Sequence, residues 1–187
     1  MQYPFSFIVR PVSGKRYDNV KKIGDLDFLI SVSKEDHKAS NRYGQVVSVP
    51  ICYKGEINIG DILLVNHNVF KYYNDMKGVE RSGKSFFKDN LFFIDFDQFF
   101  MFKSKDTWSC HSKYCMVKPL PKKNNYLKTH QDEEPLAGLI KYTNDSLIEK
   151  GVNVGDKVYF QPDSEYEYNL DGEKLYRMFT NNITMVS

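Results

Sequence analysis

The sequence predicts an all-β protein built from two small β-barrels in tandem. Aromatic residues are abundant, with 14 Phe and 13 Tyr among 187 residues, whereas alanine occurs only at positions 39 and 137. This bias favours sheet over helix. Short apolar runs stand between Gly, Asn and Asp turns, and no long amphipathic helical pattern is present. A set of short motifs occurs twice in the same order, and such a repeat identifies the folding unit.

Four pairs of segments carry the repeat. The clearest pair is an apolar-Asn-apolar-Gly-Asp motif that precedes an apolar strand in each copy. Glycine supplies the unusual φ of such a turn, and the Asp carboxylate caps it. Four matches in one order predict two copies of one domain. The pairs are 57–61 with 152–156, 7–11 with 115–119, 43–47 with 137–140, and 89–94 with 171–176.

The repeat sets the domain boundaries. We expect a first domain over residues 1–103, a polar linker over 104–113 and a second domain over 114–187. The first copy is longer, with extra residues between Pro11 and Gly44 and between Val65 and Lys88. Added loop length costs little stability, so it usually follows function or partner contacts.

Each copy is expected to contain five short strands. Apolar and aromatic runs bounded by turn residues define them. In the first copy they cover 5–12, 44–49, 61–65, 91–94 and 98–102, and in the second 114–120, 139–143, 157–161, 175–179 and 183–186.

Charge and composition exclude several classes of protein. The net charge of +2 gives no reason to expect nucleic-acid binding. No apolar stretch is long enough to cross a membrane as a helix, and the N-terminus does not resemble a signal peptide. Three cysteines do not form a secreted disulfide framework. We therefore expect a cytoplasmic protein. The bias to Lys, Asn, Tyr, Phe and Ile fits an AT-rich genome such as that of a phage, whose product would act in the host cytoplasm.

Two local patterns resemble chemical sites without the context that chemistry needs. Residues 78–85 match the phosphate-loop pattern, but their flanks predict a hairpin or a disordered loop, not a strand leading into a helix. Cys110, His111, Cys115 and His130 fit no closed zinc spacing. No Ser, His and Asp set can be defended. We therefore predict no enzyme activity, no cofactor and no metal.

The Phe-rich segment 86–102 has two interpretations. It contains more aromatic side chains than one small barrel needs inside, and alternation along a strand turns some of them outward. They form either an interface between domains or subunits or simply the core.

Both copies resemble the GroES, or chaperonin-10, co-chaperonin family. The second copy carries the family's apolar-basic-Pro strand at Val117-Lys118-Pro119, its Gly-Asp segment at 152–160 and its Asp-Gly-Glu turn at 171–173. The first copy carries the corresponding Val9-Arg10-Pro11 and the segment 57–65. The resemblance covers most of the chain and implies two tandem GroES-like barrels. The family's roof hairpin is shortened here to residues 50–55, and only one Gly precedes the candidate docking element.

The resemblance also implies a partner. In that family a long loop after the first strand carries an apolar tripeptide that docks on the rim of a chaperonin ring. The matching tripeptide here is Phe28-Leu29-Ile30, which stands among charged residues and is a candidate chaperonin-binding element. The same residues could instead form an added strand that packs on the barrel. The second copy's loop, 121–135, offers only Tyr126-Leu127 and is not expected to dock.

The leading function is therefore that of a co-chaperonin-like ring subunit. It would dock on a GroEL-like chaperonin ring and assist the folding of a substrate protein, as a homo-oligomer. The alternative is a structural or adaptor protein, for instance in a phage virion, that reuses the barrel without binding chaperonin. A nucleotide-binding enzyme is a third class, which depends on the phosphate-loop match alone.

Overall fold

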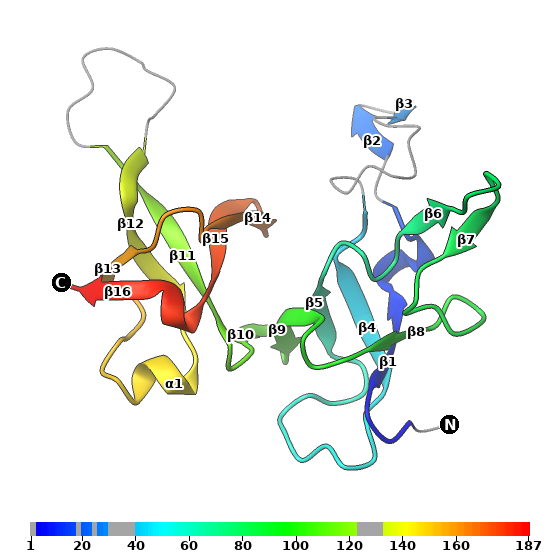
Figure 1. Ribbon diagram of the computed structural model, residues 1–187, viewed down its shortest axis with the longest axis horizontal. Helices are drawn as coiled ribbons and strands as arrows, with labels where there is room; N and C mark the ends of the chain where they lie inside the picture. The colour runs from blue at the N-terminus through cyan, green and yellow to red at the C-terminus, as the bar shows by residue number, and fades with distance from the viewer. Residues whose placement is uncertain (1–2, 18–19, 24–25, 30–39, 123–132) are drawn as a thin grey trace. The chain divides into compact units, whose positions relative to one another are not determined.

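The computed structural model describes residues 3–17, 20–23, 26–29, 40–122 and 133–187 (Figure 1). The chain divides into two compact units, Met1–Thr107 and Trp108–Ser187. The described residues are almost entirely strand and turn, so the all-β prediction is confirmed.

The first unit supplies five strands of a six-stranded antiparallel sheet, and the boundary between the units falls within the sixth, the edge strand β10. Its strand order is β10-β9-β5-β4-β1-β8. The strands span Phe7–Pro11 (β1), Tyr43–Ser48 (β4), Ile62–Val65 (β5), Phe92–Ile94 (β8), Phe99–Ser104 (β9) and Thr107–Cys110 (β10).

The second unit contains a sheet of the same size. Its order is β14-β15-β11-β12-β13-β16. The strands span Tyr114–Pro121 (β11), Glu133–Tyr142 (β12), Lys157–Phe160 (β13), Tyr166–Leu170 (β14), Glu173–Phe179 (β15) and Ile183–Val186 (β16). The short helix α1 (Asp145–Ile148) follows β12, and a 3₁₀ turn at Thr180–Asn182 precedes β16. The side chain of Asn144 caps α1 by accepting the Leu147 N–H at 3.0 Å.

The two sheets share one topology. Reading β9-β5-β4-β1-β8 in the first unit gives the same sequence of neighbours as β16-β13-β12-β11-β15 in the second. The pairing registers agree as well. Pro11 lies opposite Gly44 and Pro119 opposite Gly138, and the register shifts just before Val9 in one unit and just before Val117 in the other. The repeat seen in the sequence is therefore a repeat of structure.

The Gly-Asp turns occupy equivalent places in the two units. Gly60, at φ 97°, donates its N–H to the carbonyl of Val46 at 2.8 Å. The Val46 N–H in turn donates to the backbone carbonyl of Asp61, also at 2.8 Å. The Asp61 carboxylate accepts the Asn58 N–H at 2.8 Å. The second unit has the same three bonds. The N–H of Gly155 (φ 95°) donates to the Ile140 carbonyl at 2.8 Å, and the Ile140 N–H donates to the Asp156 carbonyl at 2.9 Å. The Asn153 N–H donates to the Asp156 carboxylate at 2.7 Å.

The sequence analysis expected closed barrels, but the described sheets are open. Over the described residues neither sheet closes, because the edge strands β8 and β10, and likewise β14 and β16, are not neighbours in the strand order. Register shifts in both sheets mark β-bulges, which bend a sheet without joining its edges.

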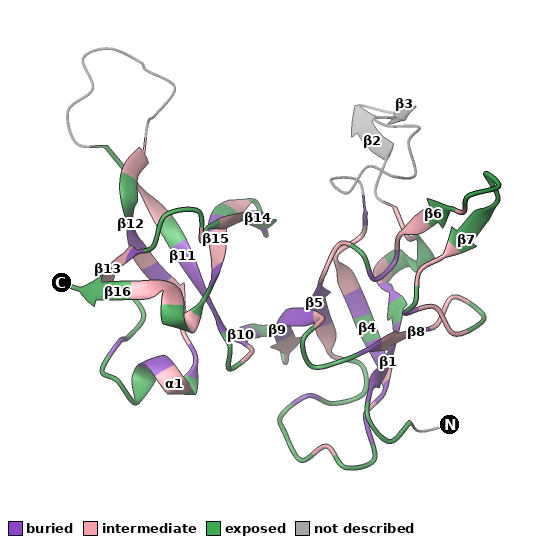
Figure 2. Ribbon diagram, in the orientation of Figure 1, coloured by how far each residue is buried: buried purple, intermediate pink, exposed green. Residues whose placement is uncertain are grey.

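Each unit has its own apolar core. Figure 2 shows buried residues concentrated on the central strands of both sheets. Most of the buried side chains in each core come from the strands of its sheet, and Phe70 and Leu147 add to them from outside the strands. The first core includes Phe7, Val9, Val46, Leu63, Phe70, Phe92, Ile94 and Phe99, and the second includes Cys115, Val117, Ile140, Leu147, Val158, Phe160 and Met178.

Two additional hairpins belong to the first unit. One is β2 (Val20–Ile23) with β3 (Leu26–Leu29), and the other is β6 (Tyr72–Asn74) with β7 (Glu80–Ser82). Each forms a separate two-stranded sheet. A 3₁₀ turn at Val12–Gly14 leads from β1 toward the first of them. The hairpins lie in the two stretches where the first copy is longer than the second.

The expected linker at 104–113 has a different structure. Lys105 and Asp106, with φ of 47° and 64°, turn the chain from β9 into β10, and Trp108 and Cys110 are buried. Two inward-facing side chains at alternate positions explain why this polar segment forms a strand.

The Phe-rich segment divides between the core and the surface. Phe92, Phe99 and Phe100 are buried, whereas Phe96 is 41% exposed and Phe93 packs against Tyr3 with ring centroids 4.7 Å apart. Four of the eight Phe side chains in this segment, those of Phe92, Phe99, Phe100 and Phe102, are buried, and the other four are partly or largely exposed.

Candidate functional site

The two extra segments of the first unit meet at one place. The flanks of residues 18–39 close on each other through a β-bridge between Tyr17 and Ser40. Ser40 donates its hydroxyl to the His67 carbonyl at 2.9 Å, and the Tyr17 hydroxyl accepts the Tyr72 N–H at 2.8 Å. The rings of Tyr17 and Tyr72 are stacked, with an interplanar angle of 11°. The base of the long loop is therefore attached to the start of the β6–β7 hairpin.

Arg16 holds this junction together. Its guanidinium lies over the ring of Tyr72, 4.1 Å from the centroid, and also over Phe86 and Phe92 at 4.8 and 4.7 Å. It donates a hydrogen bond to the Ser82 hydroxyl at 2.9 Å. The attraction between a planar guanidinium and aromatic rings is stronger at a partly buried site than at an exposed one. Arg16 thus ties the loop base, the hairpin and the core to one another.

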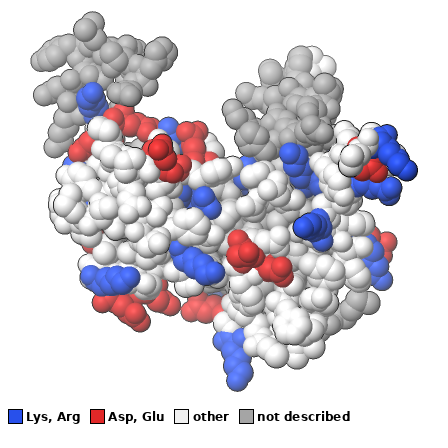
Figure 3. All heavy atoms as spheres, viewed as in Figure 1, with Lys and Arg blue, Asp and Glu red and all other residues white. Residues whose placement is uncertain are grey.

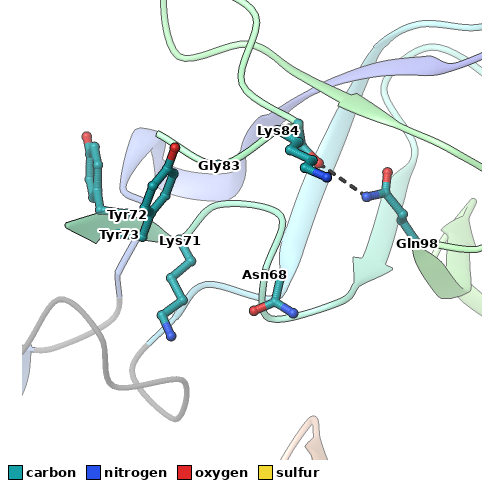
Figure 4. Close-up of a pocket in the computed structure, with 8 residues that line it drawn as sticks. Asn68, Lys71, Tyr72, Tyr73, Gly83, Lys84 and Gln98 are labelled. Carbon is teal, nitrogen blue, oxygen red and sulfur yellow. Dashed lines mark hydrogen bonds between the residues drawn. The ribbon is translucent and has the colours of Figure 1, made fainter. Parts of the chain in front are cut away.

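A pocket of about 430 Å³ lies beside this junction. In Figure 4 the rings of Tyr72 and Tyr73 stand toward one side, and Lys84 and Gln98 toward the other. The Gln98 amide donates to the hydroxyl of buried Ser85 at 3.3 Å. The complete lining is Asn68, Lys71, Tyr72, Tyr73, Gly83, Lys84, Ser85 and Gln98. Volumes of this order are typical of ligand pockets.

The charged residues that line the pocket are all basic. Two lysines, Lys71 and Lys84, line it, and no Asp or Glu does. Over the described residues neither ammonium group has an ion-pair partner within 4.0 Å. The walls are otherwise aromatic and polar-neutral. Such a lining favours an anionic group attached to an apolar body.

The hairpin that forms one wall is braced at its tip. Asp75 accepts the N–H groups of Lys77 and Val79 through its carboxylate, both at 2.9 Å, and pairs with Arg81 at 3.2 Å. These bonds hold the pKa of the Asp75 carboxyl below its usual value, led by the bond from Val79. Figure 3 shows basic side chains together with acidic ones at this tip.

The phosphate-loop match does not form a phosphate loop. Residues 78–85 comprise a turn, strand β7 and a second turn, with no helix. The backbone N–H of Gly78 is donated to Asp75 and that of Gly83 to Lys71. A phosphate loop needs such amides to point at the ligand. The hairpin expected from the sequence is therefore the correct alternative.

Two of the three candidate chaperonin-binding residues lie in the first hairpin. Phe28 and Leu29 belong to β3, where they lie opposite Lys21 and Val20 of β2. Ile30 falls outside the described residues. Leu26, at the start of β3, is 65% exposed. The segment is thus an added strand, but it pairs within its own hairpin and is not a member of the six-stranded sheet.

The second unit fixes the end of its corresponding loop with ion pairs. Glu133 lies 2.9 Å from Lys174 and also accepts the Tyr176 hydroxyl, and Glu134 pairs with Lys157. Donation of a hydrogen bond to the Glu133 carboxylate raises the pKa of the Lys174 ammonium. The candidate pair Tyr126-Leu127 lies outside the described residues. No counterpart of the β6–β7 hairpin occurs among the elements described for this unit.

The cysteines and histidines that the structure describes do not form a metal site. Within the described ranges no group of three or more His, Cys, Asp or Glu side chains could hold a metal ion. Cys110 and Cys115 are buried, and burial raises the pKa of the Cys115 thiol to about 12. His130 lies outside the described residues. Among the described helices, none has the length and apolarity to span a membrane.

Comparison with known proteins gives no assignment. No family model matches the chain. No curated protein is significantly similar to it.

Sequence reasoning missed the pocket and the role of Arg16. The available signal was the extra length between Val65 and Lys88, together with basic and aromatic residues within it. The sequence could not show that this stretch meets the base of the other long loop.

Proposed function

We propose that the chain is a co-chaperonin-like subunit that docks on a chaperonin ring and assists protein folding. The observation that carries the proposal is the duplicated sheet, in which one copy bears a hairpin with apolar residues after its first strand. In this proposal the two units are copies of a GroES-like barrel. The protein is a cytoplasmic, non-enzymatic homo-oligomer, in the host cytoplasm if a phage encodes it. Its partners are a GroEL-like ring and a substrate protein.

The docking element in this proposal is Phe28-Leu29-Ile30. It stands in a segment rich in charge, and Leu26 at the start of the same strand is largely exposed. Burial of a large apolar side chain contributes ~1.5–3 kcal/mol. Ordering a segment on binding costs ~2–5 kcal/mol. The net gain per subunit is small, so several subunits must bind together to hold the complex.

Only the first unit is assigned to docking. Its loop is anchored at Tyr17 and Ser40 against the β6–β7 hairpin, which gives the docking element a defined exit from the sheet. The second unit has no such hairpin among its described elements, and its loop ends on the ion pairs of Glu133 and Glu134.

Co-sedimentation with a purified bacterial chaperonin ring, with ADP or ATP present, tests the proposal. The wild-type chain is expected to bind, and Leu29→Asp to lose binding with an unchanged circular dichroism spectrum. Leu127→Asp is the matched control, because it makes the same change in the second copy's loop and is expected to bind as wild type does. Binding of Leu29→Asp at the wild-type level would disprove the docking role.

Failure of the wild-type chain to bind any chaperonin ring would favour the structural or adaptor alternative. Electron microscopy of the purified protein separates the two further. A closed ring is expected of a co-chaperonin, and its symmetry gives the number of subunits that bind together.

A further inference from the structure

The pocket of the first unit has the features of a binding site that docking through β3 does not use. It is built from residues 68, 71–73, 83–85 and 98, and most of these belong to the stretch in which the first copy is longer than the second. We propose that this pocket binds an acidic peptide segment, with one carboxylate at Lys71, another at Lys84 and an apolar side chain between them against Tyr72 and Tyr73. The inference stands whether or not the chain binds a chaperonin.

Charge complementarity selects the anion. Two lysines line the pocket, no acidic residue does, and no ion pair joins either lysine to a described residue. An anion brought to the pocket therefore does not compete with an internal carboxylate. Asn68 and Gln98 supply neutral polar groups at the same lining.

The backbone geometry favours a carboxylate over a phosphate. Strong phosphate sites present several backbone N–H groups to the anion. Here the Gly83 N–H is donated to the Lys71 carbonyl at 3.3 Å, and the Phe86 N–H to the Gly83 carbonyl at 3.0 Å. The remaining charged donors are side chains, which suit a carboxylate.

The position of the pocket favours a peptide. Asn68, Tyr73 and Lys84 are exposed, so the pocket opens at the surface and can admit a side chain from a polypeptide that continues on both sides. The wall is held in place on its far side, because Tyr72 stacks on Tyr17 and receives the Arg16 guanidinium on its ring. A preformed wall reduces the ordering cost of binding.

Fluorescence anisotropy with a labelled Gly-Glu-Phe-Glu-Gly peptide tests the inference, and Gly-Gln-Phe-Gln-Gly is the neutral control. We expect saturable binding of the acidic peptide with Kd below ~1 mM at low salt, weakening as salt is added. Exposed charge pairs are each worth up to about fivefold in an equilibrium constant. Lys71→Met and Lys84→Met should each weaken binding by about threefold, and the double variant by about tenfold.

Lys77→Met is the matched control, since it removes a lysine from the same hairpin outside the pocket lining. It should bind as wild type does. Equal binding of the neutral peptide, or unchanged binding by the Lys71 and Lys84 double variant, would overturn the inference. ATP is the competing probe: ATP binding tighter than the peptide and lost in Lys84→Met would assign the pocket to a nucleotide instead.

Discussion

Alanine substitution at the two equivalent glycines should have very unequal costs. Gly44 and Gly138 lie opposite Pro11 and Pro119 in the matching strand pairs. Neither glycine has a positive φ, so the backbone itself accepts an alanine at both positions. The difference lies in the space available for one methyl group.

At Gly138 that space is absent. An added Cβ would stand 2.3 Å from Val117 Cγ1 and 2.7 Å from the Lys118 carbonyl oxygen. Carbon atoms pack best at ~3.5–4.0 Å, so β11 and β12 must move apart by more than ~1 Å at this point. Overpacking of this kind costs ~1–3 kcal/mol, and we expect Gly138→Ala near the top of that range because one contact is with backbone.

At Gly44 the methyl group can be accommodated. Its nearest neighbours would be Val9 Cγ2 at 3.0 Å and Phe70 Cζ at 3.3 Å, which are both side-chain atoms. Small rotations relieve such contacts, and replacing Gly also reduces the freedom of the unfolded chain, by ~0.4–1 kcal/mol. We expect Gly44→Ala to cost at most ~1 kcal/mol.

The assay uses the single tryptophan of the chain. Trp108 lies in the second unit, is buried, and donates its indole N–H to Asp171 at 3.1 Å. Its fluorescence therefore reports unfolding of that unit. With ~4–8 °C per kcal/mol for a domain of this size, Gly138→Ala should lower the Tm by about 12–24 °C.

Amide hydrogen exchange compares the two variants on one scale. Protection should fall in β11 and β12 for Gly138→Ala and change little in β1 and β4 for Gly44→Ala. A Tm for Gly138→Ala within ~4 °C of wild type, or a greater loss for Gly44→Ala, would refute the packing argument.

Three further predictions follow from local contacts. A thiol reagent at pH 8 should modify exposed Cys52 rapidly in the native protein, whereas Cys115, whose pKa burial raises to about 12, should react only on unfolding. Glu173→Gln should reduce stability near neutral pH by under ~1 kcal/mol. Hydrogen bonds from Lys118 and Lys141 hold the pKa of the Glu173 carboxyl below 4.5. The stability that Glu173 contributes is therefore present above pH 4.5 and lost as the pH falls below it. Urea midpoints at pH 7 and pH 3 check the sign. Arg16→Lys should lower the stability of the first unit by ~1–2 kcal/mol, measured by urea unfolding followed through amide exchange, because lysine lacks the planar group that lies on three rings.

The sequence predicted the repeated part of the fold well. Strands such as Ile62–Val65 and Lys157–Phe160 follow a Gly-Asp turn, and local turn chemistry fixes where they begin. The sequence matched Pro11 with Pro119 and Gly44 with Gly138, but only the structure shows that the proline and the glycine of each copy lie opposite each other. Local signals that occur twice therefore determined these elements.

Elements outside the repeat were harder to predict. Tyr166–Leu170 and Thr107–Cys110 contain few aliphatic residues, and their pairing depends on neighbours supplied by the sheet. Barrel closure was over-predicted, because the sequence does not show whether edge strands meet. The pocket combines Asn68, Gly83 and Gln98 with Lys71 and Tyr73, and only tertiary structure brings these together.

The matched registers of the two sheets have a consequence for how such a chain can change. Each long loop leaves its sheet after the strand that ends near Pro11 or Pro119 and returns before the paired Gly44 or Gly138. Each sheet can therefore accept loops of different length at this connection without a change in its strand pairing. A twofold difference in loop length costs only ~0.6 kcal/mol of stability. One polypeptide can therefore carry a specialised loop and a plain one in a fixed one-to-one stoichiometry, which two separately synthesised chains could not guarantee.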